Sequence, residues 1–231
     1  LGDVYKRQPY DFVVRRKLSL KESEIGEADR TAIAEARRKL VFDYVGWNSS
    51  VCLVELDEEP PHQVNMEALK IAIKISKMLN MKIVDEIHFM RKQVIDGSNT
   101  SGFQRTAVVA LDGSIEVDNR CYGISSLCLE EEAAKIVEKK QGYARYSLDR
   151  LGIPLVEITT LPEISTPEEA KNVAKEIGKI LRATGEVKRG IGTIRQDINI
   201  SIEGGARQEI KGVQELNLIP CLLYTSPSPR D

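Results

Sequence analysis

An alternating polar and apolar stretch near the C-terminal end of the chain constrains the fold most. In residues 193–202, TIRQDINISI, the odd positions are polar and most even positions are isoleucine. Because successive side chains of a β-strand point to opposite faces, one face packs on a core. The other face presents Thr193, Arg195, Asp197, Asn199 and Ser201. An ordinary solvated sheet gives the same pattern, so the alternation alone leaves the function open.

A second strand follows and predicts a hairpin. Residues 207–213, RQEIKGV, place Arg207, Glu209 and Lys211 on one face. A two-residue turn at Gly204–Gly205 would oppose Ser201 to Gln208 and separate the polar residues. A three-residue turn opposes Asp197 or Asn199 to Lys211, and we predict this turn, with a glycine in the left-handed conformation. Upstream, the lysine, arginine and glycines of the segment KRGIG (188–192) are suited to binding a phosphate, and Lys188 is the first of its two basic residues.

The remaining elements follow from periodicity and from turn residues. Apolar spacing predicts helices over residues 31–46, 65–80 and 167–183, the last with Thr166 as N-cap, a capping box to Glu169 and a C-terminus at Gly185. Short apolar or alternating runs predict strands at 50–56 and 82–95 and a hairpin over 106–118 that turns at Asp112–Gly113. The absence of a βαβ rhythm predicts an α+β fold with a largely antiparallel sheet and packed helices.

Polar segments between these elements are candidates for chemistry. Residues 96–105, DGSNTSGFQR, form either a surface turn or a loop whose amides, with Arg105, bind an anion. LEEEAAK (129–135) predicts the start of a short helix, where Glu130, Glu131 and Glu132 either stabilise the helix dipole or face a site. Glu157 interrupts an apolar strand, where a carboxylate needs a partner. Carboxylates that face basic and amide groups suit Mg²⁺ and nucleotide phosphates.

Composition excludes several classes of protein. The chain has 231 residues with 33 basic and 35 acidic side chains, and no apolar run near the 18 residues of a membrane span, so we predict a protein without membrane contact. Four scattered cysteines argue against a disulfide framework and a closed zinc site, and favour the cytoplasm. A net charge of −2 gives no general signal for nucleic acid. Walker A and G-x-G-x-x-G motifs are both absent from the sequence.

The two ends of the chain differ from the rest. Residues 1–8, LGDVYKRQ, and 221–231, CLLYTSPSPRD, have no signal-peptide pattern and no clear periodicity. We predict that both are cloning or sequencing adaptor, with ordinary frayed termini as the alternative. The domain prediction is therefore residues 9–220, an internal piece of one catalytic domain.

Five long motifs together resemble a known family. They are IDGSNTSGFQRT (95–106), LEEEAAK (129–135), YSLDRLGIPLVEI (146–158), LRATGEVKRGIGTIRQDINISIEGGAR (181–207) and EIKGVQEL (209–216). The chain resembles the GatB/GatE family of glutamyl-tRNA(Gln) amidotransferase subunits, in its archaeal E-type rather than its bacterial and organellar B-type form.

The resemblance implies a fold and a reaction. The fold would be a catalytic cradle domain with a core similar to glutamine synthetase and the guanido kinases. The reaction would use ATP and Mg²⁺ to phosphorylate the γ-carboxylate of glutamate on tRNA(Gln). Ammonia from a D-type, asparaginase-like partner protein would then displace the phosphate and give glutaminyl-tRNA(Gln).

The resemblance also implies residue roles. Glu131 and Glu157 would be Mg²⁺ ligands, and with Asp197 and Lys211 they form the implied catalytic set. The implied nucleotide-binding and phosphate-binding residues are Arg195, Asn199, Ser201, Glu209, Arg150 and Lys188. Glu132 stands where the family usually has Asp, which keeps the charge. The family's N-terminal glutamate-x-histidine motif and its tRNA-binding domains are missing, so we expect this piece to be inactive alone.

Two other functions remain open from the sequence. One is a non-catalytic module that binds tRNA or a partner, against which the acidic balance weighs because phosphate neutralisation dominates RNA affinity. The other is a generic ATP-grasp or carboxylate–amine ligase. Testing which acceptor stimulates ATP turnover discriminates between the ligases.

Overall fold

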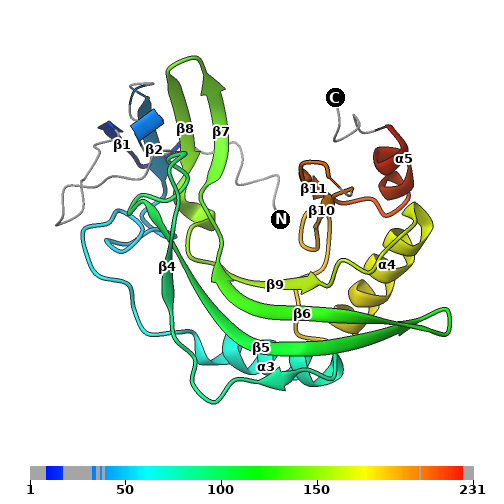
Figure 1. Cartoon of the computed structure of the whole chain (residues 1–231). Coiled ribbons are helices and arrows are strands. Elements are labelled where there is room, and N and C mark those ends of the chain that lie inside the picture. The colour runs from blue at the N-terminus through cyan, green and yellow to red at the C-terminus, as the bar shows by residue number, and fades with distance from the viewer. Residues whose placement is uncertain (1–8, 18–32, 35–36, 38–39, 203, 226–231) are drawn as a thin grey trace. The chain divides into compact units, whose positions relative to one another are not determined.

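The chain divides into two compact units. The computed structural model describes residues 9–17, 33–34, 37, 40–202 and 204–225. Unit 1 comprises residues 1–65, 88–107 and 129–155, and unit 2 comprises 66–87, 108–128 and 156–231. Strands β5 (Phe103–Val117), β6 (Arg120–Glu131) and β9 (Pro154–Thr160) contribute residues to both units (Figure 1).

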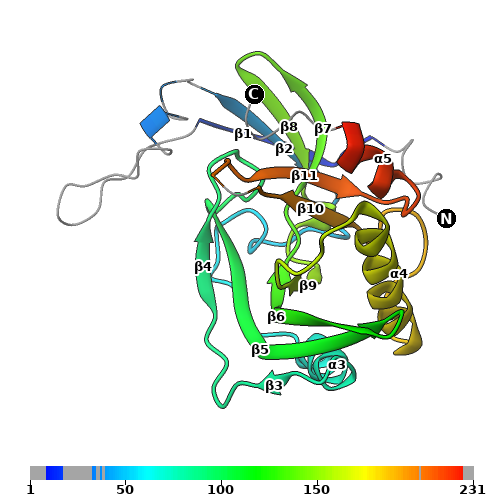
Figure 2. The same cartoon turned by 45° about the vertical axis from the view of Figure 1, so that its right-hand side comes forward.

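Unit 1 contains a four-stranded sheet of mixed direction (Figure 2). The strand order is β1 (Phe12–Lys17), β2 (Val41–Gly46), β8 (Tyr143–Ser147) and β7 (Lys135–Lys140). The outer pairs are antiparallel, whereas β2 and β8 are parallel. The 3₁₀ turn η1 (Leu148–Arg150) follows β8. One face of this sheet forms a core whose buried members are Phe42, Tyr44, Ala134, Ala144, Tyr146 and Leu148.

Two buried tyrosines connect this core to the loop after β4 (Met90–Gln93). The rings of Tyr44 and Tyr146 stack with centroids 6.0 Å apart. Tyr44 Oη donates to the Gly97 carbonyl at 2.7 Å, and Tyr146 Oη donates to the Asp96 carbonyl at 2.8 Å. Burial raises the pKa of Tyr146 to about 12. Both hydroxyls therefore remain neutral donors at physiological pH and hold the loop on the sheet.

The same sheet carries a buried carboxylate, Asp43, whose side chain is 1% exposed. Arg15 Nε donates to Asp43 Oδ1 at 2.7 Å, and Tyr143 Oη donates to Oδ2 at 2.8 Å. The hydrogen bond from Arg15 is the main reason why the pKa of Asp43 falls to about 2, although burial opposes the shift. The strand register explains this contact, because Arg15, Asp43 and Arg145 are directly opposed across three strands.

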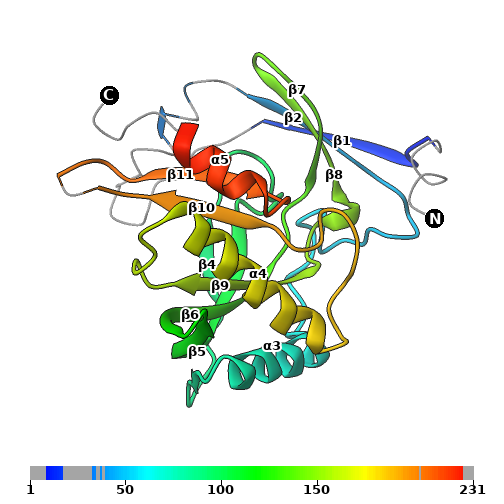
Figure 3. The same ribbon diagram turned by 90° about the vertical axis from the view of Figure 1, so that its right-hand side faces the viewer.

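Unit 2 combines helices with the remaining strands. It contains α3 (Met66–Met78), α4 (Pro167–Ala183), α5 (Leu218–Thr225), β3 (Lys82–Ile83) and the antiparallel pair β10 (Gln196–Ile200) and β11 (Gln208–Val213) (Figure 3). Lys74 Nζ of α3 donates to the Thr184 carbonyl at the C-terminal end of α4, at 3.0 Å. The buried apolar residues of unit 2 are Ala72, Ile75, Leu79, Met81, Val109, Ala110, Ile115, Tyr122, Ile124, Leu127, Val173, Val213 and Ile219.

Two predicted helices are confirmed. α3 occupies most of residues 65–80, and α4 begins with the predicted capping box between Thr166 and Glu169. Gly185 follows α4 with a φ of 73°, as a left-handed C-terminal residue should. α5 extends across residue 220, the predicted boundary of the C-terminal tail. Both helix predictions succeeded because spacing and caps are local signals.

Other local predictions are wrong. Residues 41–46 form β2 instead of the end of a helix. Residues 33, 34 and 37 of the same predicted helix are helical, and residues 31–32, 35–36 and 38–39 lie outside the described residues. Residues 50–56 form turns instead of a strand. Residues 82–95 form two short strands, β3 and β4, separated by irregular chain. In each case the local pattern does not decide the structure, because a strand forms only where a distant strand pairs with it.

The predicted hairpin turn at Asp112–Gly113 is also wrong. β5 continues through it to Val117, and the chain turns at Asp118–Asn119, where φ is 52° and 62°. Asp112 does adopt a positive φ, 51°, but within the strand. Gly113 is needed for a close approach, since a Cβ there would lie 2.7 Å from the Leu79 carbonyl oxygen. In the described part of the chain, no helix is both long and apolar enough to cross a membrane.

Candidate functional site

The three adjacent glutamates lie at the end of a strand. Residues 129–131 complete β6, so the predicted helix over LEEEAAK is wrong, and so is a helix-dipole role for its acidic residues. Because neighbouring side chains of a strand face opposite sides, Glu130 and Glu131 are directed to different surroundings. The strand therefore places the two carboxylates on opposite faces.

Glu130 is buried, at 6% exposed, and is surrounded by hydrogen-bond donors. Its Oε1 accepts from Thr106 Oγ1 at 3.0 Å and lies 3.4 Å from Lys92 Nζ. Its Oε2 lies 3.4 Å from Gln104 Nε2. These donors come from β4 and β5, where Lys92 and Gln104 are directly opposed. The negative charge of Glu130 is thus compensated by donors on β4 and β5.

Glu131 is half-buried and pairs with Arg105 of β5, with Arg105 Nη1 3.0 Å from Glu131 Oε1. Burial raises the pKa of Glu131 above its usual value, Arg105 lowers it, and the neighbouring Glu55 raises it. The backbone is held as well, because Gln104 Nε2 donates to the Glu131 carbonyl at 2.8 Å. The role of Glu131 as a metal ligand stays a prediction.

Glu132 pairs with a residue that the sequence suggested for phosphate binding. Arg150 Nη2 lies 3.1 Å from Glu132 Oε1, in the turn that follows β8. Glu132 also bonds through its backbone N–H to the Ile153 carbonyl at 2.7 Å, and its carbonyl accepts from Gly152 at 2.9 Å. Glu132 therefore connects β6 to the segment that carries Arg150. The phosphate role of Arg150 stays a prediction.

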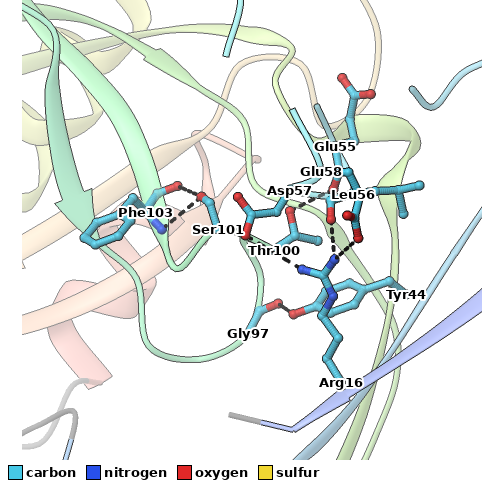
Figure 4. Close-up of polar contacts among 10 residues, drawn as sticks. All are labelled: Arg16, Tyr44, Glu55, Leu56, Asp57, Glu58, Gly97, Thr100, Ser101 and Phe103. Atoms are coloured by element: carbon cyan, nitrogen blue, oxygen red, sulfur yellow. Dashed lines mark hydrogen bonds and ion pairs between the residues drawn. The ribbon is translucent and has the colours of Figure 1, made fainter. Parts of the chain in front are cut away.

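Two loops of unit 1 are held beside one another (Figure 4). Thr100 Oγ1 donates to the Glu55 carbonyl at 2.7 Å, which joins the polar loop to residues 52–58. Arg16 of β1 donates to the Leu56 carbonyl and lies 3.3 Å from Glu58 Oε1. Arg105, which follows this loop in β5, pairs with the carboxylate of Glu131, and anion binding by the loop stays a prediction.

In unit 2 the predicted polar hairpin is present. Asn199 opposes Glu209, and Ile200 opposes Gln208. Asn199 therefore does not oppose Lys211 as one predicted register has it. The described pairing ends at Ile200 and Gln208, so the three-residue turn stays a prediction, while Gly204 has the predicted positive φ, 73°. The exposed positions of β10 alternate with partly buried ones, so the polar residues share the outer face. These residues include Asp197, Asn199, Glu209 and Lys211.

An irregularity separates the predicted partners Asp197 and Lys211. The register shifts between Gln196 and Ile198, and Gly212 adopts a φ of 72°. Asp197 Oδ1 accepts from the Gly212 backbone N–H at 2.7 Å, while Lys211 Nζ lies 3.4 Å from Glu209 Oε2. Asp197 is thus oriented by a backbone amide instead of by the lysine.

The other predicted site residues of unit 2 are exposed. Glu157 lies on β9 with its side chain exposed, so the premise that it is buried in an apolar strand is wrong. Its role as a metal ligand stays a prediction. Lys188 lies in the exposed connection after α4, and Arg195 and Ser201 flank β10 on its exposed face. The structure places Glu131 and Arg150 in unit 1 and the other eight predicted site residues in unit 2.

The donor set fits a nucleotide-bound Mg²⁺ better than a closed metal cage. Within the residues that the structure describes, no three His, Cys, Asp or Glu side chains converge as a metal site. Mg²⁺ in nucleotide sites commonly uses one or two carboxylates and completes its shell with phosphates and water. Glu131 in unit 1 and Glu157 in unit 2 each offer carboxylate oxygens, the type of ligand that Mg²⁺ takes, and the metal role of each stays a prediction.

Sequence reasoning missed several residues around the glutamates. Lys92, Thr106 and Gln104 compensate Glu130, and Glu55 acts on Glu131. The alternation of Gln104 and Thr106 on one face of β5 was the available signal. It becomes informative only once β4 and β6 are known to flank β5.

Comparisons with known proteins agree with the motifs. The family described as the GatB/GatE catalytic domain matches residues 33–225. The chain is 63% identical over 209 residues to the E-type glutamyl-tRNA(Gln) amidotransferase subunit of Archaeoglobus fulgidus, a match that covers 90% of this chain and 34% of the relative. The E-type subunits of Methanocaldococcus jannaschii and Pyrococcus horikoshii are 58% and 55% identical, over 90% and 92% of this chain and 33% and 34% of their own length.

The chain therefore spans about a third of the length of these curated relatives. The family match covers most of the chain, including β6 with its glutamates and the β10–β11 hairpin. The chain belongs to the GatB/GatE catalytic domain family.

Proposed function

We propose that this chain is the catalytic domain of an E-type amidotransferase that converts glutamyl-tRNA(Gln) to glutaminyl-tRNA(Gln). The observation that carries the proposal is its identity of 55–63% to proteins of that name, over about 90% of its length. An asparaginase-like partner protein would supply the ammonia. The fold would be that of the cradle domain, similar to glutamine synthetase and the guanido kinases.

The reaction has two steps. An oxygen of the glutamyl γ-carboxylate attacks the γ-phosphorus of ATP, and the bond from that phosphorus to the ADP oxygen breaks. Ammonia then attacks the carbonyl carbon of the acyl phosphate, the carbon–oxygen bond breaks, phosphate leaves with the electron pair, and nitrogen loses a proton. Activation is needed because a free carboxylate is a poor electrophile.

Residues of both units support this chemistry. When bound, Mg²⁺ would neutralise charge on the phosphoryl oxygens. In unit 1 Glu131 would be a Mg²⁺ ligand, and in unit 2 Glu157 would be a Mg²⁺ ligand. On the hairpin, Asp197 is held by the Gly212 amide, and Lys211 and Arg195 offer cations for phosphate oxygens. Lys188, Asn199, Ser201 and Glu209 would complete the nucleotide-binding residues of unit 2. In unit 1, Arg150 would be a phosphate contact.

The test uses the full-length protein that contains this sequence, with its asparaginase-like partner, and separately with ammonium chloride as the nitrogen source. Glu131→Gln keeps the shape of the side chain and removes its charge. We expect ATP-dependent formation of glutaminyl-tRNA(Gln) to fall about 100-fold or more, the scale of losing one electrostatic group. Glu176→Gln, on α4 and outside the predicted site residues, is the control and should leave the rate unchanged.

The outcomes separate the alternatives. Unchanged phosphorylation in Glu131→Gln refutes the metal role of that residue. A wild-type protein that binds tRNA but turns over no ATP favours a non-catalytic binding module. Stimulation of ATP turnover by a free carboxylate and amine, and not by glutamyl-tRNA(Gln), identifies a different ligase.

A further inference from the structure

We propose that Arg105 is a positioning residue that fixes the orientation of the Glu131 carboxylate for a divalent cation. The inference rests on the proposed function, in which Glu131 is a metal ligand, and goes beyond it by assigning a role to an arginine outside the predicted site set. It rests on three contacts of one guanidinium group.

The guanidinium of Arg105 is held on three sides within unit 1. Its Nη1 lies 3.0 Å from Glu131 Oε1 and donates to the His62 carbonyl at 2.8 Å. Its Cζ lies 4.9 Å from the centre of the Phe89 ring. The side chain is 18% exposed, so solvent screens these contacts only in part. A planar guanidinium group with a carboxylate, a carbonyl and an aromatic ring around it has little freedom to rotate.

The partners of Arg105 are themselves held in place. The segment that ends at His62 is joined to the polar loop by Thr100, at the Glu55 carbonyl, and to β1 by Arg16 (Figure 4). The Glu131 backbone is held by Gln104 at 2.8 Å. Arg105 therefore transmits the position of the 52–62 segment to the Glu131 side chain.

Charge and geometry predict opposite effects at this position. A cation beside a metal ligand repels the metal, so an arginine that acted only through its charge would weaken metal binding. An arginine that orients the ligand strengthens it, because a carboxylate held in one rotamer loses less entropy on binding. Two substitutions separate these effects: Arg105→Lys keeps the charge and loses the planar fork, and Arg105→Gln loses both.

The chain offers a matched control in unit 2. Arg120 Nη1 lies 2.9 Å from Glu169 Oε1, its Nη2 donates to the Glu163 carbonyl at 3.0 Å, and its Cζ lies 4.9 Å from the centre of the Tyr122 ring. The same three kinds of partner surround both arginines. Glu169 belongs to the capping box of α4 and is not a candidate ligand. Arg120→Lys therefore reports the general cost of loosening such a contact.

The experiment measures Mn²⁺ binding to the full-length protein, as a spectroscopic substitute for Mg²⁺, by electron paramagnetic resonance. Both Arg105 variants should bind Mn²⁺ about 10- to 100-fold more weakly than wild type, the usual effect of losing an outer-shell partner. Arg120→Lys should bind Mn²⁺ as wild type does. In the amidation assay, the Mg²⁺ concentration for half-maximal rate should rise by the same factor in the Arg105 variants, while kcat at saturating Mg²⁺ is largely retained.

Several results would overturn the proposal. Mn²⁺ affinity that is unchanged in Arg105→Lys removes the positioning role, and tighter binding in Arg105→Gln shows that Arg105 acts through its charge alone. Wild-type protein that binds no Mn²⁺ overturns both this inference and the metal role of Glu131. If Arg105→Gln does not fold, Arg105→Lys carries the test alone. If the Arg105 variants bind Mn²⁺ more weakly but the wild-type protein does not catalyse amidation, the positioning role of Arg105 holds and the proposed function is refuted.

Discussion

Asp43 shows how one buried charge makes stability depend on pH. Its pKa of about 2 lies below the ordinary value of 3.8, so the unfolded state binds a proton more readily than the folded state. Its contribution to the free energy of unfolding is therefore complete above about pH 4 and is lost as the pH falls toward 2. Because Arg15 is largely exposed, we expect a contribution of about 1–2 kcal/mol instead of the full value for a buried pair.

Asp43→Asn tests this expectation. Urea unfolding at pH 7 should show a loss of about 1–2 kcal/mol relative to wild type, because the ionic hydrogen bond with Arg15 is gone. The difference between the two proteins should shrink between about pH 4 and pH 2, where the wild-type carboxylate becomes protonated. A difference that stays constant over this range would contradict the assignment of the charge to Asp43.

At the residue scale, the sequence indicates which residues carry chemical groups better than it indicates the burial and partners of those residues. The LEEEAAK motif indicates Glu131, but the pairing of Glu131 with Arg105 depends on two strands, β5 and β6, that meet only in the folded chain. Glu157 was expected to be buried because its neighbours are apolar, yet its side chain is exposed. Motifs report residue identity, whereas burial and pairing depend on tertiary partners.

Among the elements, α4 owes part of its stability to its N-cap. The Glu169 backbone N–H donates to Thr166 Oγ1 at 3.2 Å, and the Ser165 backbone N–H donates to Glu169 Oε2 at 2.8 Å. Thr166→Ala removes the first of these bonds and should lower the free energy of unfolding by about 1 kcal/mol. Chemical denaturation measures the change. Glu168→Gln, in the same turn but outside the box, should change stability by less than half as much, and an equal loss in both would contradict the capping role.

The irregularity in the β10–β11 hairpin makes a second prediction. Gly212 has a φ of 72° and nothing within 4 Å of an added Cβ, so Gly212→Ala meets only backbone strain, about 1 kcal/mol. Relaxing that strain shifts the amide that holds Asp197, so the amidation rate of the full-length protein should fall as well.

Gly142→Ala is the matched control for this change. Gly142 has a φ of 76° and is equally open, and it lies in the turn between β7 and β8. Both variants should lose similar stability in urea, but only Gly212→Ala should lose activity. Equal activities in the two variants would show that the Gly212 amide does not serve Asp197 in catalysis.

At the element scale, helices and strands are predictable where the residues that determine them lie close together in the sequence. α3, α4 and the β10–β11 hairpin were predicted because spacing, caps and turn glycines lie within about twenty residues. β2 was mistaken for a helix because Leu40, Val41 and Tyr44 also fit helical spacing, and its partner β8 lies about a hundred residues away. The end of β6 was mistaken for a helix because three glutamates favour one locally.

At the scale of the whole molecule, we predict that residues 9–220 alone do not catalyse ATP-dependent amidation. The E-type relatives are about three times as long as the match. Incubating the purified piece with ATP, Mg²⁺, ammonium chloride and glutamyl-tRNA(Gln) should give no glutaminyl-tRNA(Gln), while the full-length protein does so under identical conditions. Product from the isolated piece would show that the chemistry needs no other part of the protein.

The two suspected tails remain predictions at the same scale. Residues 1–8 and 226–231 lie outside the described residues, while residues 221–225 belong to α5. Sequencing the source genomic DNA across both ends tests the idea. Finding the codons for LGDVYKRQ and CLLYTSPSPRD in that DNA shows that both tails are genuine.

The parallel pairing of β2 with β8 has a consequence for how the chain folds. Val41–Val45 must pair with Tyr143–Ser147, and two segments of unit 2, residues 66–87 and 108–128, lie between these strands in the sequence. Closing such a long loop is entropically slow, so the sheet of unit 1 forms late relative to local helices. Until β8 arrives, one edge of β2 has open backbone groups that another chain can pair with. During its synthesis the chain is therefore most exposed to aggregation between the appearance of residue 46 and that of residue 147.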